Sequence, residues 1–281
     1  TQGVSSAASD VYKRQDFNRS WTGISYGSGY EGQGCVNDEM TNYYVEFMKK
    51  HIFAYLNPPI TSKVLPMYWY LGYNVYSKSV LEVGGVILAS WIVPIHENYD
   101  GLDYWCTCMF GEDNPSEPYL IPTDRALLDR RRKMILAPVL EKAVKAGNII
   151  IPEEFEVGFD HVTNLIAGLG MEDDPNYYLT RGYPGSVNTY VFNSISEPAN
   201  NSYPPTNEET FIGYMHLSMY YNQARLTEVY PADKYPFLTE KFAFVQKYLK
   251  DKYQIDLEAI ANGPEDWDLP LPPIPETPDE E

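Results

Sequence analysis

Histidine residues are the first place to look for chemistry in this chain of 281 residues. It has four of them, His51, His96, His161 and His216, and no two stand at the i, i+4 spacing that places a metal pair on one helix face. The sequence His-Glu-x-x-His is absent. The chain therefore carries no intact zinc-protease motif.

Other catalytic motifs are incomplete as well. The glycines between Gly27 and Gly34 lack the strand-turn-helix context of a phosphate-binding loop, and Gly27-Ser28-Gly29 does not complete a nucleophile elbow. With 39 acidic residues, choosing a pair for a glycosidase would be arbitrary. The three cysteines are Cys35, Cys106 and Cys108, and Cys-x-Cys lacks the spacer of common zinc and redox motifs. We expect Cys106 and Cys108 to be buried small hydrophobic residues on one face of a strand; a bridge from Cys35 to one of them is the alternative in an oxidising compartment.

Charge and hydropathy exclude two classes of partner. Lys and Arg total 21 against 39 Asp and Glu, and the resulting net charge of -18 repels phosphate backbones, so we expect no nucleic-acid binding. The longest apolar stretch, Val83 to Ile95, is broken by glycine, serine and proline and is too short for a membrane-spanning helix. The 25 tyrosines and 5 tryptophans could stack on sugars or peptides, but their positions favour strand and helix core.

The elements that would position these residues alternate between helix and strand. Apolar spacing predicts a helix over Asp38 to Tyr55, a small sheet, and a helix from about Thr123 to Lys145 that Pro138 should kink or divide. Arg130, Arg131 and Arg132 are interpreted as a solvated face of that helix, paired with carboxylates. The strands of the sheet are predicted at Val64 to Tyr70, Val83 to Val93 and Leu102 to Phe110.

The second half of the chain is predicted to be mainly helical. Helices are expected over Glu153 to Leu169 and over Glu208 to Tyr221, and the last one presents an apolar stripe of Leu238, Phe242, Val245 and Leu249. Residues 1–15 resemble translated adaptor sequence, in which case the true N-terminus is missing; a flexible N-terminal linker is the alternative. One domain is expected over residues 16–262, followed by an acidic, proline-rich tail over residues 263–281 without regular structure.

One resemblance connects these elements. The order of the helices and sheet, the segment Arg181-Gly182-Tyr183-Pro184 and the closing sequence PFLTEKFAFVQKYLKDKYQIDLEAI resemble the family of predicted zinc-binding metallopeptidases among secreted lipoproteins of gut bacteria. The similarity covers most of residues 38 to 262. It implies an α+β, zincin-like single domain with helices packed on a small mixed sheet. It also implies an extracytoplasmic protein that is lipid-anchored at the outer membrane.

The resemblance also implies a lost metal centre. Zincins hold zinc with the two histidines of His-Glu-x-x-His, and their glutamate activates the bound water. The best placement here is Phe155-Glu156-Val157-Gly158-Phe159, where Glu156 remains as a remnant general base and phenylalanine stands at both ligand positions. Phe155, Phe159 and Tyr183 would then line the old substrate cleft. For each of Glu156, His161 and Glu209, an ordinary structural role is the competing interpretation.

Three hypotheses about function follow. The leading one is a degenerate peptidase without zinc that acts as a binding or accessory protein for peptide or glycan. The alternative is an active zinc endopeptidase whose ligands come from His161, His216 and Glu209. The third is a structural partner in an outer-membrane protein complex.

Overall fold

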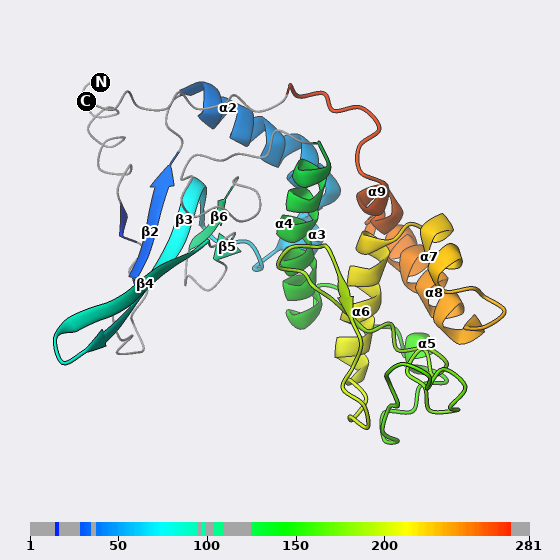
Figure 1. Cartoon of the computed structure of the whole chain (residues 1–281). Helices are drawn as coiled ribbons and strands as arrows, with labels where there is room; N and C mark the ends of the chain where they lie inside the picture. Colours follow the sequence, from blue (N-terminus) through cyan, green and yellow to red (C-terminus); the bar gives the residue numbers. More distant parts are fainter. Residues whose placement is uncertain are drawn as a thin grey trace. The chain divides into compact units, whose positions relative to one another are not determined.

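The computed structural model describes residues 15–16, 29–34, 38–94, 97–98, 104–108 and 125–270 (Figure 1). The chain separates into two compact units. Unit 1 takes residues 1–49, 66–128 and 269–281, and unit 2 takes residues 50–65 and 129–268. A division into compact units does not show whether each unit folds independently. The single domain predicted over residues 16–262 therefore stays a prediction.

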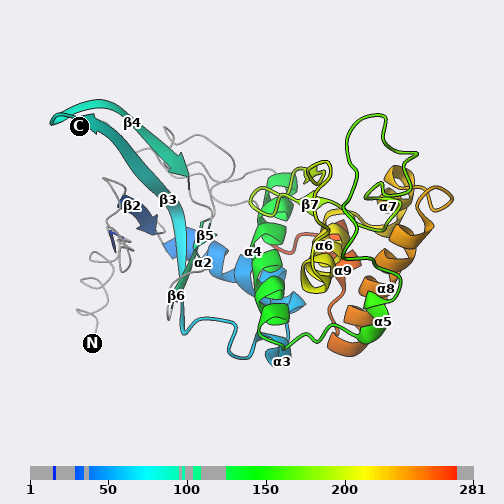
Figure 2. The same cartoon turned by 90° about the horizontal axis from the view of Figure 1, so that it is seen from below.

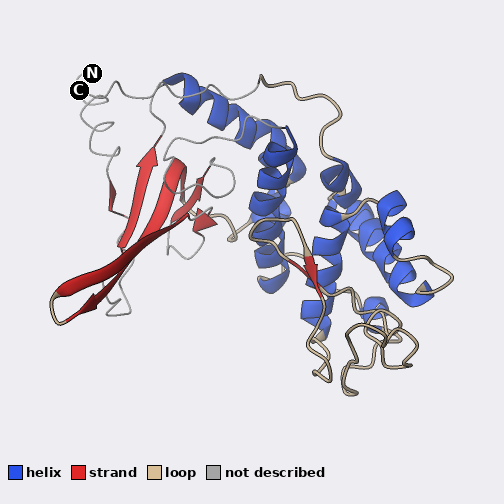
Figure 3. Ribbon diagram, in the orientation of Figure 1, coloured by secondary structure: helices blue, strands red, loops and turns tan. Residues whose placement is uncertain are grey.

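Unit 1 is built around one mixed sheet, which contains the larger strands in Figure 3. Its six strands in the described residues are β1 (Gln15–Asp16), β2 (Gly29–Gly34), β3 (Tyr68–Val83), β4 (Val86–Pro94), β5 (Glu97–Asn98) and β6 (Tyr104–Cys108). They follow the order β1-β2-β3-β6-β5, and β4 pairs with β3. The pairing of β3 with β6 is parallel, whereas the other pairings are antiparallel. This confirms the predicted combination of helices with a small mixed sheet.

Strand β3 has 16 residues and exceeds the run predicted from sequence. It begins at Tyr68, because the preceding residues 62–65 form turns after the short helix α3 (Pro58–Thr61). It continues to Val83 through polar residues, because different parts of it pair with β2, β4 and β6. Gly84 and Gly85 both have positive φ and form the turn to β4, a conformation that glycine adopts without steric cost.

Helix α2 (Asp38–Phe47) packs on this sheet within unit 1. The hydroxyls of Tyr44 and Thr107 are 2.8 Å apart in the buried contact between α2 and β6. Cys106 is buried beside Trp105, as expected for small hydrophobic cysteines in a strand. The side chain of Cys108 and all of Cys35 lie outside the described residues, so their pairing stays a prediction. The helix predicted to reach Tyr55 continues as a π-helix (Met48–Ile52) and a 3-10 turn (Phe53–Tyr55).

Unit 2 is mainly helical, with long loops (Figures 1 and 2). Its helices include α5 (Glu153–Glu156), α6 (Asn207–Tyr220), α7 (Gln223–Val229), α8 (Pro236–Tyr253), α9 (Leu257–Asn262) and most of α4 (Arg125–Lys145). A short hairpin of β7 (Ser186–Val187) and β8 (Ile195–Ser196) lies with β7 against α6. Helix α4 runs through Pro138 without division. Among the described residues, no helix combines the length and apolar character needed to cross a membrane.

Local sequence explains the two helices that form the centre of unit 2. The Thr206 side chain caps α6, and Glu209 returns a carboxylate to the Thr206 backbone in a capping box. Helix α8 begins with Pro236, where a missing N–H costs nothing, and ends at Gln254 in the left-handed conformation. The predicted stripe on α8 is confirmed, since all four of its residues are fully buried: Leu238, Phe242, Val245 and Leu249.

Two predictions for unit 2 are wrong. The helix expected over residues 153–169 is only the four residues of α5, because Val157 leaves the helical region and Gly158 has a φ of +93°. The arginine triplet is not a solvated face, since Arg131 is 2% exposed and Arg132 fully buried. The Arg132 guanidinium does pair as predicted, 2.9 Å from Asp129, and it also donates to the Ile260 carbonyl at 2.7 Å. Those bonds offset the cost of burying its charge.

The tail begins as predicted, without helix or strand over residues 263–270, but it is not free of contacts. In unit 2, the Trp267 ring lies 4.3 Å from the His51 ring. In unit 1, Leu269 is buried and its carbonyl accepts from Arg125 at 2.8 Å. Residues 271–281 lie outside the described part, as do residues 1–14 of the predicted adaptor segment.

Candidate functional site

Unit 2 contains a cavity of about 640 Å³. The end of α4 and one face of α6 form two of its walls, and the loops on either side of β7 and before α6 form the others. Figure 2 shows α4, β7 and α6 as neighbours. Its lining residues are Glu141, Lys145, Leu165, Tyr183, Pro184, Gly185, Ser186, Val187, Thr189, Pro198, Tyr203, Pro204, Pro205, Glu209, Thr210, Ile212, Gly213 and His216.

Glu141, Lys145, Glu209 and His216 are the ionisable groups that two helices bring to the cavity. Lys145 donates to Oε1 of Glu141 at 2.6 Å, across one turn of α4. Oε2 of Glu141 lies 3.7 Å from Nε2 of His216 on α6. The cavity therefore has a polar end between α4 and α6, and four of its other lining residues are prolines: Pro184, Pro198, Pro204 and Pro205.

Glu209 serves the helix as well as the cavity. Its Oε2 accepts hydrogen bonds from the Thr206 backbone N–H at 2.8 Å and from the Thr206 hydroxyl at 2.9 Å. These bonds hold the pKa of Glu209 below its usual value, because they stabilise the charged form. Glu209 is thus ionised at neutral pH, and one of its oxygens is committed to the capping box.

His216 is only 8% exposed, although it lines the cavity. Burial lowers its pKa to about 4, because the charged imidazolium loses its hydration, and the nearby Glu141 carboxylate only partly opposes this. The ring is therefore neutral at pH 7, and its contact with Glu141 is not an ion pair. Nε2 has no hydrogen-bond partner among the described residues.

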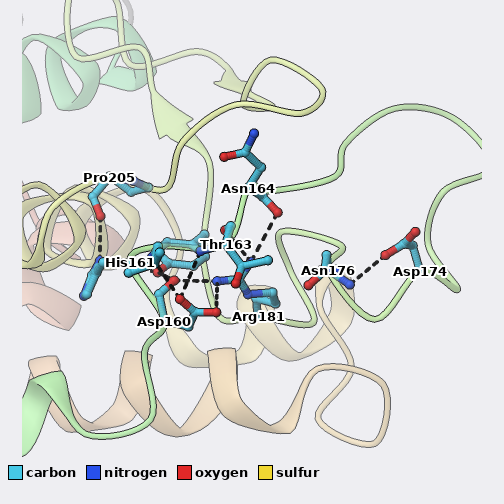
Figure 4. A network of polar contacts seen from close by, with 10 residues as sticks. Asp160, His161, Thr163, Asn164, Asp174, Asn176, Arg181 and Pro205 are labelled. Atoms are coloured by element: carbon cyan, nitrogen blue, oxygen red, sulfur yellow. Dashed lines mark hydrogen bonds and ion pairs between the residues drawn. The ribbon is translucent and has the colours of Figure 1, made fainter.

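A network of polar contacts joins the loops around Asp160 and Arg181 (Figure 4), and Tyr183, which lines the cavity, is bonded to this network. Asp160 accepts from the backbone N–H groups of Val162 and Thr163, and bonds from Thr163 and Val162 lower its pKa to about 2. Arg181 joins this turn to its own segment by donating to the carbonyls of Asp160 and Thr163. The Tyr183 hydroxyl donates to the Asp160 carbonyl at 2.9 Å. This bond holds the Tyr183 side chain against the loop that contains Asp160.

Gly182 also positions this wall, and replacing it by alanine is expected to destabilise unit 2. Its φ is +79°, and a Cβ there would lie 2.5 Å from the Phe237 ring. The strained backbone alone costs about 1–3 kcal/mol. Gly170→Ala is the matched control, because Gly170 has a φ of +80° and a Cβ added there would meet nothing within 4 Å. Urea unfolding should show a larger loss for Gly182→Ala; equal losses would mean that the Phe237 contact yields without cost.

The structure separates the residues predicted to form the degenerate zinc motif. Phe155 is fully buried, which places it in the core of unit 2 and not in a cleft. Its ring lies 5.1 Å from Phe211 and 5.8 Å from Tyr214. Glu156 is exposed at the end of α5 and does not line the cavity. Phe159 packs behind Tyr183, with ring centres 5.4 Å apart, and only Tyr183 of the three predicted cleft residues lines the cavity.

The alternative zinc ligands are brought together only in part. His216 and Glu209 line the same cavity. His161 is not in a helix and does not line the cavity, and its Nδ1 lies 2.7 Å from the Pro205 carbonyl (Figure 4). Over the described ranges, no group of three or more His, Cys, Asp and Glu side chains could hold a metal ion. Zinc binding, like its absence, stays a prediction.

Comparisons with known proteins add one distant likeness. No protein-family model and no curated protein matches the sequence. A solved structure matches: a "putative zinc-binding metallo-peptidase" from Bacteroides caccae, with 14% identity and a TM-score of 0.41 over 90% of this chain and 85% of that one. Since this TM-score is too low to carry an argument, the zincin-like topology stays a prediction, whereas the content of helices and mixed sheet is seen directly.

Sequence reasoning missed Glu141 and Lys145 as cavity residues. They stand at the i, i+4 spacing near the end of α4, which predicts an ordinary ion pair on a helix surface. Their importance comes from His216, which lies 75 residues further along the chain but meets Glu141 in space. Spacing along a single helix cannot predict this contact, because Glu141 and His216 belong to different helices.

Proposed function

We propose that the protein is a non-catalytic binding protein whose cavity in unit 2 holds part of a peptide or glycan. The supporting observation is the cavity itself, which combines an apolar wall with a few convergent polar groups. That combination is typical of sites that bind organic ligands, because the apolar wall supplies contact area and the polar groups fix orientation. The volume of about 640 Å³ lies within the usual range for such sites.

The apolar wall suits an extended or ring-shaped ligand. Pro184, Pro204 and Pro205 line it with rigid rings. Tyr203 also lines the cavity and is 82% exposed, so its ring is available at the rim for stacking on a sugar face or a peptide side chain. Aromatic contact of this kind supports the proposal that a glycan or peptide is held there.

An active zinc endopeptidase is the second candidate, and one observation favours it: His216 and Glu209 line the same cavity. A ligand set of His161, His216 and Glu209 would require these side chains to move, because over the described ranges no group of three such side chains could hold a metal ion as it stands. The binding role needs no such rearrangement, so it is the better-supported proposal.

Gly213 offers a direct test of the cavity. It lies inside α6, lines the cavity and has an ordinary φ, and its nearest neighbour to an added Cβ is Pro184 at 3.7 Å. Gly213→Met should fill the cavity while the helix persists, and Gly213→Ala is the matched control, which should stabilise α6 by up to about 1 kcal/mol. Peptide and oligosaccharide arrays would be screened with the unmodified protein, and the tightest-binding compound measured by calorimetry.

We expect the alanine variant to bind that compound and the methionine variant to lose at least about tenfold in affinity, which corresponds to about 1.4 kcal/mol. Equal binding by both variants would place the ligand elsewhere and refute the proposal. Metal analysis of the protein purified without chelators accompanies the screen. Stoichiometric zinc together with cleavage of an array peptide would replace the binding role by the endopeptidase.

The cellular setting is proposed on the family resemblance. We infer an extracytoplasmic protein, lipid-anchored at the outer membrane in its full-length form. There it would present the cavity to peptides or glycans, and an outer-membrane protein complex is the partner that this setting offers.

A further inference from the structure

The hairpin of β3 and β4 in unit 1 reaches past the neighbouring strand β2 (Figure 1). Strand β2 pairs with β3 only as far as Lys78, whereas β4 continues to pair with β3 as far as Val83. Among the described strands, the sheet is therefore only two strands wide from Ser79 to Ser90. A two-stranded ribbon is marginally stable in water unless further strands or a packed face support it.

This end of the hairpin is apolar and exposed. Leu81 is 48% exposed, and the four other large apolar residues are 59–62% exposed: Val83, Val86, Ile87 and Leu88. All the residues of β4 from Val86 to Ser90 are exposed, and successive side chains of a strand alternate between its two faces. Both faces of the ribbon thus present apolar surface. Contiguous surface of this kind marks an interaction site.

The edge of β4 has the properties of a strand that accepts another strand. Strand β4 pairs with β3 and with no other described strand, so alternate N–H and C=O groups along its second edge have no strand partner there. Lysine and other charged residues commonly protect such edges, but none occurs from Val86 to Pro94. The ladder with β3 is irregular at Leu88 and continuous from Ala89 to Pro94, which gives an evenly spaced edge.

A strand fits this edge better than a lipid bilayer does. Open sheet edges do not occur in the hydrocarbon of a membrane, because their N–H and C=O groups find no partners there. Insertion of the hairpin end would also carry the carboxylate of Glu82, which lies between Leu81 and Val83, out of water. A paired strand avoids both costs, since it supplies the missing backbone hydrogen bonds and leaves Glu82 at the surface.

A second copy of the chain supplies a matching strand. Two copies repel each other over most of their surface, because each has a net charge of -18, but β4 brings no charge to the contact. Antiparallel pairing of β4 with itself about a two-fold axis at Ser90 places serine opposite serine. It also places Leu88 opposite Ile92, and Ala89 opposite Trp91. Like residues thus meet along the edge, which favours pairing between strands.

We propose that two copies of this protein associate through β4, antiparallel about Ser90, and form a four-stranded sheet in which the two β4 strands lie at the centre. This inference goes beyond the proposed function and is independent of it, because it uses unit 1 and no residue of the cavity. One strand from each copy makes a smaller interface than the roughly 1,200–2,000 Å² of a standard stable complex. The dimer therefore forms reversibly and depends on protein concentration.

Sedimentation equilibrium of the unmodified protein over a range of concentrations tests the association. We expect a monomer–dimer equilibrium. Ser90→Glu should weaken the dimer by about fivefold or more, because it places two carboxylates opposite each other at the axis. Leu81→Glu is the matched control, since it adds the same charge to the exposed neighbouring strand but not to the shared edge; it should change the dissociation constant by less than about twofold. Circular dichroism would confirm that both variants are folded.

The register has a test of its own. Ser90→Lys should also weaken the dimer, but an equal mixture of Ser90→Glu and Ser90→Lys should associate more tightly than either variant alone, because opposite charges then face each other at the axis. A mixture that associates no better would overturn the pairing about Ser90.

Three further outcomes would overturn the proposal as a whole. The first is an unmodified protein that stays monomeric at the highest concentration reached. The second is equal weakening by Ser90→Glu and Leu81→Glu, which would mean that the apolar hairpin end associates without use of the β4 edge. The third is a protein that stays monomeric in solution but floats with phosphatidylcholine vesicles and loses this binding in Leu81→Glu, which would make a lipid surface the partner.

Discussion

Phe155→Ala is expected to lower the free energy of unfolding by about 3–5 kcal/mol, which is the usual cost of removing a fully buried aromatic ring. Phe155 has no exposed surface, and its ring is surrounded by the rings of Phe159, Phe211, Tyr214 and Phe244 at centre distances of 5.3, 5.1, 5.8 and 6.2 Å. The alanine variant would leave a void that these neighbours can fill only in part. Urea unfolding followed by circular dichroism would measure the loss.

Val157→Ala is the control for this experiment, because Val157 is two positions away and 70% exposed. It should change stability by no more than about 0.5 kcal/mol. The comparison also separates a core residue from a cleft residue. If Phe155 lined a substrate cleft, its truncation would weaken ligand binding and leave stability almost unchanged; that outcome would contradict the packing described above.

Acidification from about pH 7 to about pH 4.5 should cost unit 2 about 2–3 kcal/mol through His216 alone. Its pKa falls from 6.5 to about 4 on folding, so between these values the unfolded chain binds a proton that the folded chain does not. The contribution of His216 to stability is therefore complete above pH 6.5 and is lost as the pH falls toward 4. Carboxylates whose pKa folding lowers lose their contribution only as the pH falls below their ordinary values near 4.

His216→Asn isolates this effect. Asparagine does not titrate, and its amide keeps a hydrogen-bonding group at this position. The stability of the variant should therefore depend less on pH between about 6.5 and 4.5 than that of the unmodified protein, by most of the expected 2–3 kcal/mol. Urea midpoints measured across this range would show it. Parallel curves for the two proteins would mean that His216 stays protonated in the fold.

Helices that carry their own signals could be predicted from sequence. The predicted start of α6 is within one residue of the observed one, because Thr206 and Glu209 form a cap from local sequence, and the stripe on α8 defines its buried face. The prediction of a helix over residues 153–169 is wrong for two reasons. The apolar residues there pack into an aromatic core from a loop, and Gly158, with its positive φ, follows the early end of α5. Burial of Arg131 and Arg132 depends on neighbours distant in sequence, so charge alone misplaced them.

The candidate site was predictable only as separate residues. His216, Glu209 and Tyr183 were identified, and all three line the cavity. Alignment with the zinc motif predicts Glu156, Phe155 and Phe159 at a substrate cleft, and none of them lines this cavity. Glu141 was missed, because its contact with His216 joins two helices whose pairing no local pattern encodes.

Gly158 and Gly182 both lie against the ring of Phe237. A methyl group at Gly158 would lie 3.0 Å from the Phe237 ring, and one at Gly182 would lie 2.5 Å from it. Positions 158, 182 and 237 are consequently not independent: a smaller side chain at 237 would relieve crowding at both glycines, although their positive φ would still disfavour other residues. Divergence in this part of the chain is thus expected to proceed by compensating changes, and the effect of any one substitution will depend on which residue occupies the other two positions.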